Sequence, residues 1–339
     1  MTDLRISAVD YHTAGEPFRI VADPPVEIRG HSVAERRAHA AGDQDVNRLR
    51  QLLCYEPRGH ADMYGAFITP PDDAGAHFGV LFWHKDGFST ACGHGTIALG
   101  VWALQTGRVG FSAGGPTDVV IDVPSGRVSA RVHAEDRRIT AVDFVNVPSY
   151  VTGLDLPVAT ARGEALANIS FGGAFYASVD AASLGLRVVP EHLEELIGLG
   201  REIKRQLNDS PAARHHSDER LSGIYGTIFY EDLGREQTGD LHQRNVTIFA
   251  DGEVDRSPCG SGTCARLAEL VTSGELEPAQ GFTHDSIVGT RFLARTIDRV
   301  SADGHDAVIP QVTGMAYKTA EHIFSADPDD ELVPGFVLR

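Results

Sequence analysis

The chain has 339 residues, of which 42% are hydrophobic and 23% are charged, and its formal net charge at pH 7 is −17. This length allows two domains with substantial cores, and the composition is that of an ordinary soluble globular protein. The acidic balance argues against nucleic acid or an anionic membrane as a partner, so an anionic small-molecule substrate would need a local anion-binding site.

The cysteines and the first residues of the chain bear on its compartment. Cys54, Cys92, Cys259 and Cys264 form no C-x-x-C pair and show no spacing typical of a disulfide framework. Reduced thiols are therefore expected. Residues 1–5 lack the basic-then-apolar order of a signal peptide, and no stretch approaches the ~18 apolar residues of a membrane span. The prediction is a cytoplasmic protein without a membrane partner.

The predicted elements are mostly strands, with a few helices between them. Extended segments are expected over residues 5–28, and a capping-box pattern that begins at Ser32 predicts one or two helices as far as Leu53. Residues 97–104 read as a helix that is apolar on all sides and must therefore be buried. Residues 191–207 read as an amphipathic helix. Alternation and β-branched residues predict strands at 63–68, 77–83, 119–123, 128–132, 139–147, 174–179, 226–230, 244–250, 286–300 and 307–317.

Two short stretches of the chain are copies of each other. The first reads CGHGTIA from Cys92, and the second reads CGSGTCA from Cys259. Laid over one another without a gap, 16 positions give six identities, at an offset of 259 − 92 = 167 residues, which is close to half of 339. We interpret this as an internal duplication. It predicts two α/β halves, residues 1–150 and 151–339, with the last strand free to return to the first half.

The local pattern around each cysteine predicts a reactive site. Glycines after each cysteine allow a sharp turn and a close approach of N–H groups to a ligand. The apolar run that follows reads as a helix, and Gly107 and Gly274 stand where a C-terminal glycine cap belongs. Each cysteine should therefore lie at a helix N-terminus, where anions bind and where a thiol pKa falls from ~8.5 toward neutrality. Two such helix ends on one anion would make a carboxylate pocket flanked by two thiols.

Two thiols of similar basicity suit proton transfer at a carbon atom, because one can remove a proton from one face while the other returns a proton to the opposite face. This chemistry needs no cofactor, and nucleotide-binding glycine patterns and a G-x-S-x-G elbow are absent. Three alternatives remain open: cysteines that only fill the core, a binding protein on a retired enzyme fold, and a zinc site. The adjacent His215 and His216 lack cysteine or acidic partners at metal-ligand spacing, so no metal is predicted.

Four stretches of this sequence resemble motifs of the proline racemase family, which includes 4-hydroxyproline epimerases and trans-3-hydroxy-L-proline dehydratases. They are Cys92–Thr96, Asp255–Thr263, residues 12–17 and residues 56–60, so the resemblance spans nearly the whole chain. It implies a diaminopimelate-epimerase-like α/β fold. In that fold two similar domains each form a curved sheet around a central helix, and the active site lies in the cleft.

The resemblance also implies roles for individual residues. By position, Cys92 and Cys259 match the two acid/base residues of the family. The implied substrate-binding groups are His94 and Asp255 at the ring nitrogen, the backbone N–H groups of Gly93, His94, Gly260 and Ser261 at the carboxylate, and the rings of Tyr64 and Phe249 against the substrate ring.

The subfamily is the open point. Dehydratases of the family usually have threonine in place of the second cysteine, so Cys259 favours a racemase or epimerase. Residues 62–65, 79–82, 87–90 and 97–100 are nevertheless more similar to dehydratases. The leading prediction is a cofactor-independent racemase or epimerase that inverts Cα of proline or a hydroxyproline. The alternative is a trans-3-hydroxy-L-proline dehydratase that gives pyrroline-2-carboxylate. In either case the protein could form a homodimer.

Overall fold

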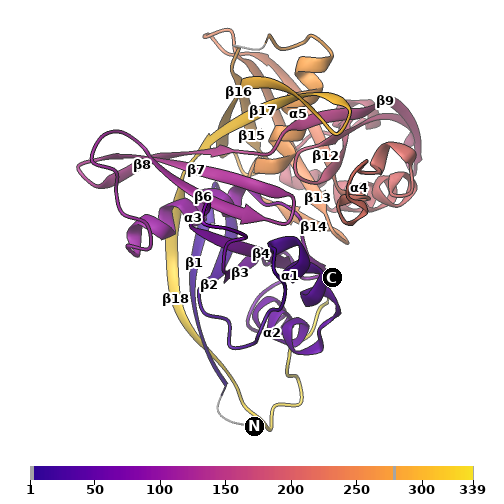
Figure 1. Ribbon diagram of the computed structural model, residues 1–339. Coiled ribbons are helices and arrows are strands. Elements are labelled where there is room, and N and C mark those ends of the chain that lie inside the picture. The colour runs from indigo at the N-terminus through magenta and orange to yellow at the C-terminus, as the bar shows by residue number, and fades with distance from the viewer. Residues whose placement is uncertain (1–3, 278–279, 339) are drawn as a thin grey trace. The chain divides into compact units, whose positions relative to one another are not determined.

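The computed structural model describes residues 4–277 and 280–338 (Figure 1). The first residues of the segment considered for a signal peptide lie outside this part. The chain forms two units: unit 1 is Met1–Val142 with Met315–Arg339, and unit 2 is Asp143–Gly314. The predicted halves were 1–150 and 151–339, with the last strand able to return to the first half. The last segment joins unit 1 because strand β18 (Ala316–Ala326) runs antiparallel to β1 (Leu4–Thr13) along its full length.

The described part of unit 1 contains three helices and strands that pair in both parallel and antiparallel directions. Strand β18 pairs with β1 and β1 with β2 in antiparallel fashion, β2 and β3 are parallel, β3 and β4 are antiparallel, and β4 continues in parallel to β6. The further elements are β2 (Glu16–Val21), α1 (Val33–Gly42), α2 (Gln44–Cys54), β3 (Gly65–Thr69), β4 (Phe78–His84), β5 (Gly87–Phe88), α3 (Gly93–Gln105), β6 (Thr117–Val123) and β7 (Gly126–Glu135), and β8 (Arg138–Val145) crosses the boundary between the units.

The described strands of unit 2 also pair in both parallel and antiparallel directions, and helices α4 and α5 pack against them. Its elements are β9 (Ser149–Thr160), β10 (Gly163–Phe171), β11 (Phe175–Asp180), α4 (Leu193–Leu207), β12 (Ile224–Arg235), β13 (Leu241–Phe249), β14 (Glu253–Asp255), α5 (Gly260–Thr272), β15 (Phe282–Ser286), β16 (Arg291–Ala302) and β17 (His305–Gly314), with short 3₁₀ helices at Ala181–Leu184, Pro190–His192, Pro211–Ala213 and Glu219–Leu221.

The strands of the two units repeat the same order of pairings, so the duplication extends from the cysteine motif to the strands. In unit 2, β9, β10 and β11 are successively antiparallel, β11 and β12 are parallel, β12 and β13 are antiparallel, and β13 continues in parallel to β15. Helix α3 packs against β1, β2, β6, β7 and β18, and α5 packs against β9, β10, β11, β16 and β17. Because β17 also pairs with β9, the sheet of unit 2 closes on itself.

The predicted element types are largely confirmed, including the buried helix after Cys92, whose residues 93–104 are all buried. Strands β5, β9, β10, β14, β15 and β18 lie wholly or almost wholly outside the predicted runs. The predicted run 286–300 corresponds to β16 (Arg291–Ala302), and its first residues form the turn after β15, where Gly289 has a φ of +80°. In the described part of the chain, no helix has both the length and the apolar character needed to cross a membrane.

The helix boundaries follow from capping residues. Ser32 accepts the N–H of Glu35 at 3.2 Å, as the capping box predicted, and Asp43 accepts two N–H groups at the start of α2. Gly107 and Gly274 follow α3 and α5 with φ values of +72° and +79°. These are the left-handed C-terminal caps that the sequence predicted.

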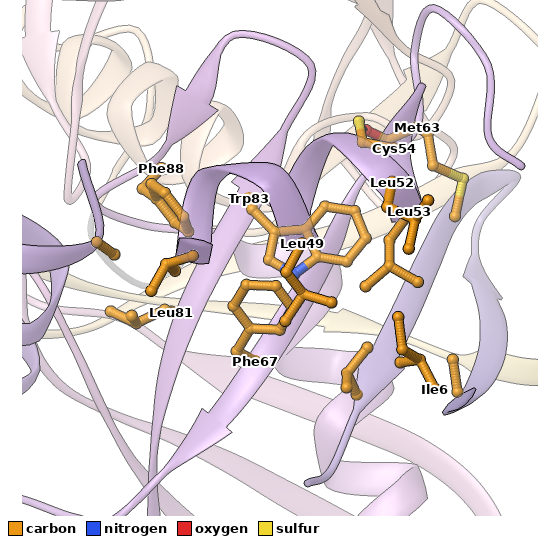
Figure 2. Close-up of a cluster of buried hydrophobic side chains, with 14 of the residues drawn as sticks. Ile6, Leu49, Leu52, Leu53, Cys54, Met63, Phe67, Leu81, Trp83 and Phe88 are labelled. Atoms are coloured by element: carbon orange, nitrogen blue, oxygen red, sulfur yellow. The ribbon is translucent and has the colours of Figure 1, made fainter. Parts of the chain in front are cut away.

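The core of unit 1 lies between α2 and the sheet. Leu49 and Leu52 recur at helical spacing on one face of α2, and they join the buried cluster that contains Phe67 and Trp83, whose ring centroids are 5.6 Å apart (Figure 2). Cys54, at the end of α2, belongs to this core and is completely buried. It is therefore a packing residue.

A buried ion pair on α5 carries the first stability prediction. Arg266 donates to Glu269 at 2.7 Å, both side chains are almost completely buried, and Ser170 and Ser178 also donate to Glu269. Glu269→Ala leaves the Arg266 charge buried without its partner, so we expect a loss of about 3–5 kcal/mol of unfolding free energy. Urea denaturation measures this loss. The control is the exposed ion pair between Arg201 and Asp251. Asp251→Ala should lower the unfolding free energy by less than about 1 kcal/mol.

Candidate active site

Cys92 is the N-cap residue of α3, as predicted. Its Sγ accepts the N–H of Gly95 at 3.2 Å, and its carbonyl oxygen accepts the hydroxyl of Thr96 at 2.7 Å. A methyl group on Gly95 would lie 2.7 Å from that sulfur and 2.4 Å from the ring of Phe18. Glycine is therefore needed at this position for the sulfur to reach a helix N–H.

The imidazole of His94 lies against this thiol. Its two ring nitrogens are 3.5 and 3.6 Å from Sγ of Cys92, and the donor depends on the tautomer. The ring of Tyr64 meets the His94 ring edge-on, with centroids 5.1 Å apart, and the Tyr64 hydroxyl shares a hydrogen bond with that of Ser89. The hydroxyl of Thr13 donates to the carbonyl of His94 at 2.8 Å. Both the backbone and the ring of His94 are thus held in place.

Cys259 is the N-cap residue of α5 and repeats this arrangement in unit 2. Its Sγ accepts the N–H of Gly262 at 3.3 Å, and a methyl group on Gly262 would lie 2.9 Å from the sulfur. The backbone of the two cysteines differs, because φ is +61° at Cys259 and −157° at Cys92. A positive φ is unfavourable for a residue with a Cβ atom and persists only where neighbouring groups hold it.

Asp255 is connected to Cys259 through Ser257. The Ser257 hydroxyl accepts the N–H of Cys259 at 3.0 Å and donates to Oδ1 of Asp255 at 2.7 Å. The backbone N–H of Ser257 donates to the same Oδ1 at 2.8 Å. Asp255 and Ser257 are both buried. The carboxylate that the family resemblance assigns to the substrate nitrogen is therefore part of the turn that carries the thiol.

The aromatic side chain of Tyr176 lies beside the thiol of Cys259, and two further rings pack behind it. The hydroxyl of Tyr176 lies 2.7 Å from the Ser261 hydroxyl and 3.9 Å from Sγ of Cys259. Tyr225 meets Tyr176 edge-on at 5.9 Å between centroids and stacks on Phe249 at 5.7 Å. Phe249 thus joins this part of the site through a chain of packed rings.

The prediction that the helix end lowers the thiol pKa is wrong for Cys259. Burial raises the pKa of this thiol well above its ordinary value, and the charge of Asp255 raises it further. The N–H of Gly262 and two hydroxyl groups stabilise the thiolate but do not outweigh these causes. The sequence shows the helix end but not the desolvation. Cys264 is fully buried, and burial raises its pKa as well.

Each unit gathers its own share of the predicted site residues. Unit 1 brings together Cys92, Gly93, His94 and Tyr64, and unit 2 brings together Cys259, Gly260, Ser261, Asp255 and Phe249. Thr13, Ser89 and Ser257 lie in stretches that resemble the family, but no role was assigned to them or to Tyr176. Ser257 could have been found from its place between Asp255 and Cys259, whereas Tyr176 carries no local signal.

The first N–H groups of a helix have no partner inside the helix, and they favour an anion. A thiol beside such a helix end is an acid/base group next to a carboxylate-binding feature. The fold and these residues define a two-unit α/β enzyme with one helix-capping thiol in each unit. The chain belongs to the proline racemase family, whose model matches residues 8–337.

Relatives of known name cover the whole length of the chain. It is 42% identical over 332 residues to the trans-3-hydroxy-L-proline dehydratase of Bacillus thuringiensis, which covers 98% of both chains. It is 39% identical over 335 residues to the 3-hydroxyproline 2-epimerase of Burkholderia multivorans, again with 98% of both chains covered. Among solved structures, a hydroxyproline epimerase from Agrobacterium vitis with bound trans-4-hydroxy-L-proline matches with a TM-score of 0.90 and 29% identity, covering 98% of this chain and 96% of that one.

Proposed function

We propose that the chain is a cofactor-independent racemase or epimerase that inverts Cα of proline or a hydroxyproline. The observation that carries this proposal is the repeated thiol: Cys92 and Cys259 each cap a helix, and each accepts an N–H group from its first turn. Packing alone gives no reason to keep the same capped thiol in both units. An inversion needs two acid/base groups, because one removes the Cα proton and the other supplies a proton to the opposite face.

The substrate carboxylate accepts N–H groups at the two helix ends, where partial positive charge favours an anion. These N–H groups also stabilise the negative charge that moves onto the carboxylate when Cα loses its proton. The proposed contacts are Gly93, His94, Gly260 and Ser261 at the carboxylate, His94 and Asp255 at the ring nitrogen, and Tyr64 and Phe249 against the ring.

The proton steps balance without any other reactant. One thiolate takes the Cα proton, the electron pair of the C–H bond moves into the carboxylate as an enediolate, and the other thiol gives its proton to Cα. Burial and Asp255 raise the pKa of Cys259, so this thiol keeps its proton at neutral pH. Cys259 therefore fits the donor role in the first turnover, with Cys92 as the base.

Dehydration of trans-3-hydroxy-L-proline is the second candidate, and the 42% identity to a dehydratase of that name favours it. The first step is the same removal of the Cα proton. The electron pair then forms a double bond between Cα and C3, and the C3 hydroxyl leaves as water with a proton from an acid group. The thiol of Cys259 can supply that proton, and the product tautomerises to pyrroline-2-carboxylate.

The two reactions separate when the purified protein receives L-proline, trans-4-hydroxy-L-proline and trans-3-hydroxy-L-proline in turn in deuterated water. Inversion changes the optical rotation and places deuterium at Cα, and we expect this result with at least one of the three. Dehydration gives pyrroline-2-carboxylate, which forms a coloured product with aminobenzaldehyde. If trans-3-hydroxy-L-proline gives the coloured product and no substrate is inverted, the racemase proposal is wrong and the dehydratase proposal takes its place. Binding of the three compounds without either product contradicts both candidates.

A further inference from the structure

The two thiol turns have different backbones although their sequences are copies. Cys259 has the left-handed φ of +61°, whereas Cys92 is extended with a φ of −157°. Pro258 precedes Cys259, whereas the aligned residue before Cys92 is Ala91. Since a left-handed cysteine is unfavourable in itself, specific contacts must hold the turn at Cys259.

Hydrogen bonds fix the peptide groups on both sides of Cys259. Its N–H donates to the hydroxyl of Ser257 at 3.0 Å, and its carbonyl oxygen accepts the N–H of Thr263 at 2.7 Å. The carbonyl of Pro258 accepts the side chains of Asn245 and Thr263 at 2.8 and 3.0 Å. Of these contacts, the one made by Ser257 holds the N–H of the cysteine itself.

The same serine fixes the carboxylate of Asp255. Its N–H and its hydroxyl both donate to Oδ1, at 2.8 and 2.7 Å. Ser257 is completely buried, so water does not compete for these bonds. One hydroxyl therefore stands between the carboxylate proposed to bind the substrate nitrogen and the backbone of the proposed acid/base thiol.

We propose that Ser257 is a positioning residue, whose hydroxyl holds the left-handed turn at Cys259 and orients the carboxylate of Asp255. The inference rests on the proposed function insofar as Cys259 acts as an acid/base group. The effect of the Ser257 hydroxyl on the turn can be tested without substrate, whatever reaction the protein catalyses.

The test is Ser257→Ala, which removes one oxygen atom and adds no volume. Without the hydroxyl the turn relaxes and the buried thiol becomes accessible. We expect iodoacetamide to modify Cys259 about tenfold faster relative to Cys92 than in the wild type, as measured by peptide mass spectrometry. Cys92 lies in the other unit and serves as the reference within the same molecule. With the substrate found in the activity panel, kcat should fall about 100-fold while KM changes less than about threefold.

Two further variants make the test specific. Ser178→Ala removes another buried hydroxyl of unit 2, which donates to Glu269 at 2.9 Å and not to a residue of the turn. It should leave the ratio of Cys259 to Cys92 modification unchanged. Ser257→Thr keeps the hydroxyl and should restore the wild-type ratio and most of kcat.

An unchanged ratio in a folded Ser257→Ala protein, or an equal rise in Ser178→Ala, overturns the positioning role. A failure of Ser257→Thr to restore the ratio, when that variant folds, also overturns it. Ser257→Ala can be tested even if the wild type turns over none of the three substrates. A raised modification ratio in that case supports the role of Ser257 in holding the turn, while the lack of turnover contradicts the proposed function. Circular dichroism confirms the folding of each variant.

Discussion

Replacement of either Cys92 or Cys259 by serine is expected to lower kcat/KM for inversion by about 10³-fold or more, because each enantiomer needs one group as base and the other as acid. A serine hydroxyl holds its proton far more tightly than a thiol and cannot replace it as a base near neutral pH. Optical rotation and deuterium incorporation at Cα measure the loss.

Cys264→Ala is the matched control for the cysteine variants. This thiol is fully buried in α5, and its pKa is raised by burial, so its loss should lower stability without stopping inversion. A Cys259→Ser protein that inverts its substrate at nearly the full rate contradicts the two-base mechanism. If the reaction is dehydration, Cys259→Thr should keep most of the activity while Cys92→Ser removes it.

The second large effect is expected for Gly95→Ala. The new methyl group would lie 2.7 Å from Sγ of Cys92 and 2.4 Å from the ring of Phe18, so it must displace the thiol from the helix end. A displacement of about 1 Å at a reacting group costs about 100-fold in rate. Steady-state kinetics with the substrate from the activity panel measures this loss.

Gly100→Ala separates this effect from simple overcrowding of the core. It adds a methyl group to the same helix, 2.7 Å from Cβ of Ala130 and away from the thiol. Both variants should lose about 1–3 kcal/mol of unfolding free energy. Only Gly95→Ala should also lose activity beyond what its stability explains. Equal activities of the two variants would mean that the contact between the sulfur and the helix N–H has no role in the reaction.

Local patterns in the sequence predict the cysteine turns well. Small residues in the first turn and glycines at positions 107 and 274 fix where each helix begins and ends, and these signals depend only on neighbours in the chain. Cys92 and Cys259 both cap their helices as predicted. The repeat of the motif also predicts two related halves, because a duplicated sequence preserves the order in which strands pair.

Long-range packing accounts for the contacts and strands that no local pattern in the sequence indicates. Tyr176 reaches Cys259 from a strand more than eighty positions away, and no local pattern indicates that contact. After Ala316 no residue of strand β18 is fully buried, so its sequence lacks the alternation of apolar and polar residues that predicts a strand. The pKa of Cys259 was predicted with the wrong sign because the helix end is visible in the sequence, whereas the depth of burial is a property of the folded chain.

The pairing of β18 with β1 has a consequence for biosynthesis. Unit 2 is one uninterrupted stretch of chain, and its described strands are all synthesised before β18. Domains fold as units during synthesis, and pairings between distant segments form late because closing a long loop costs entropy. Unit 2 can therefore complete its strand pairings first, whereas unit 1 keeps the edge of β1 open until β18 has been synthesised. The unit whose first strand is made earliest is thus the unit that is completed last.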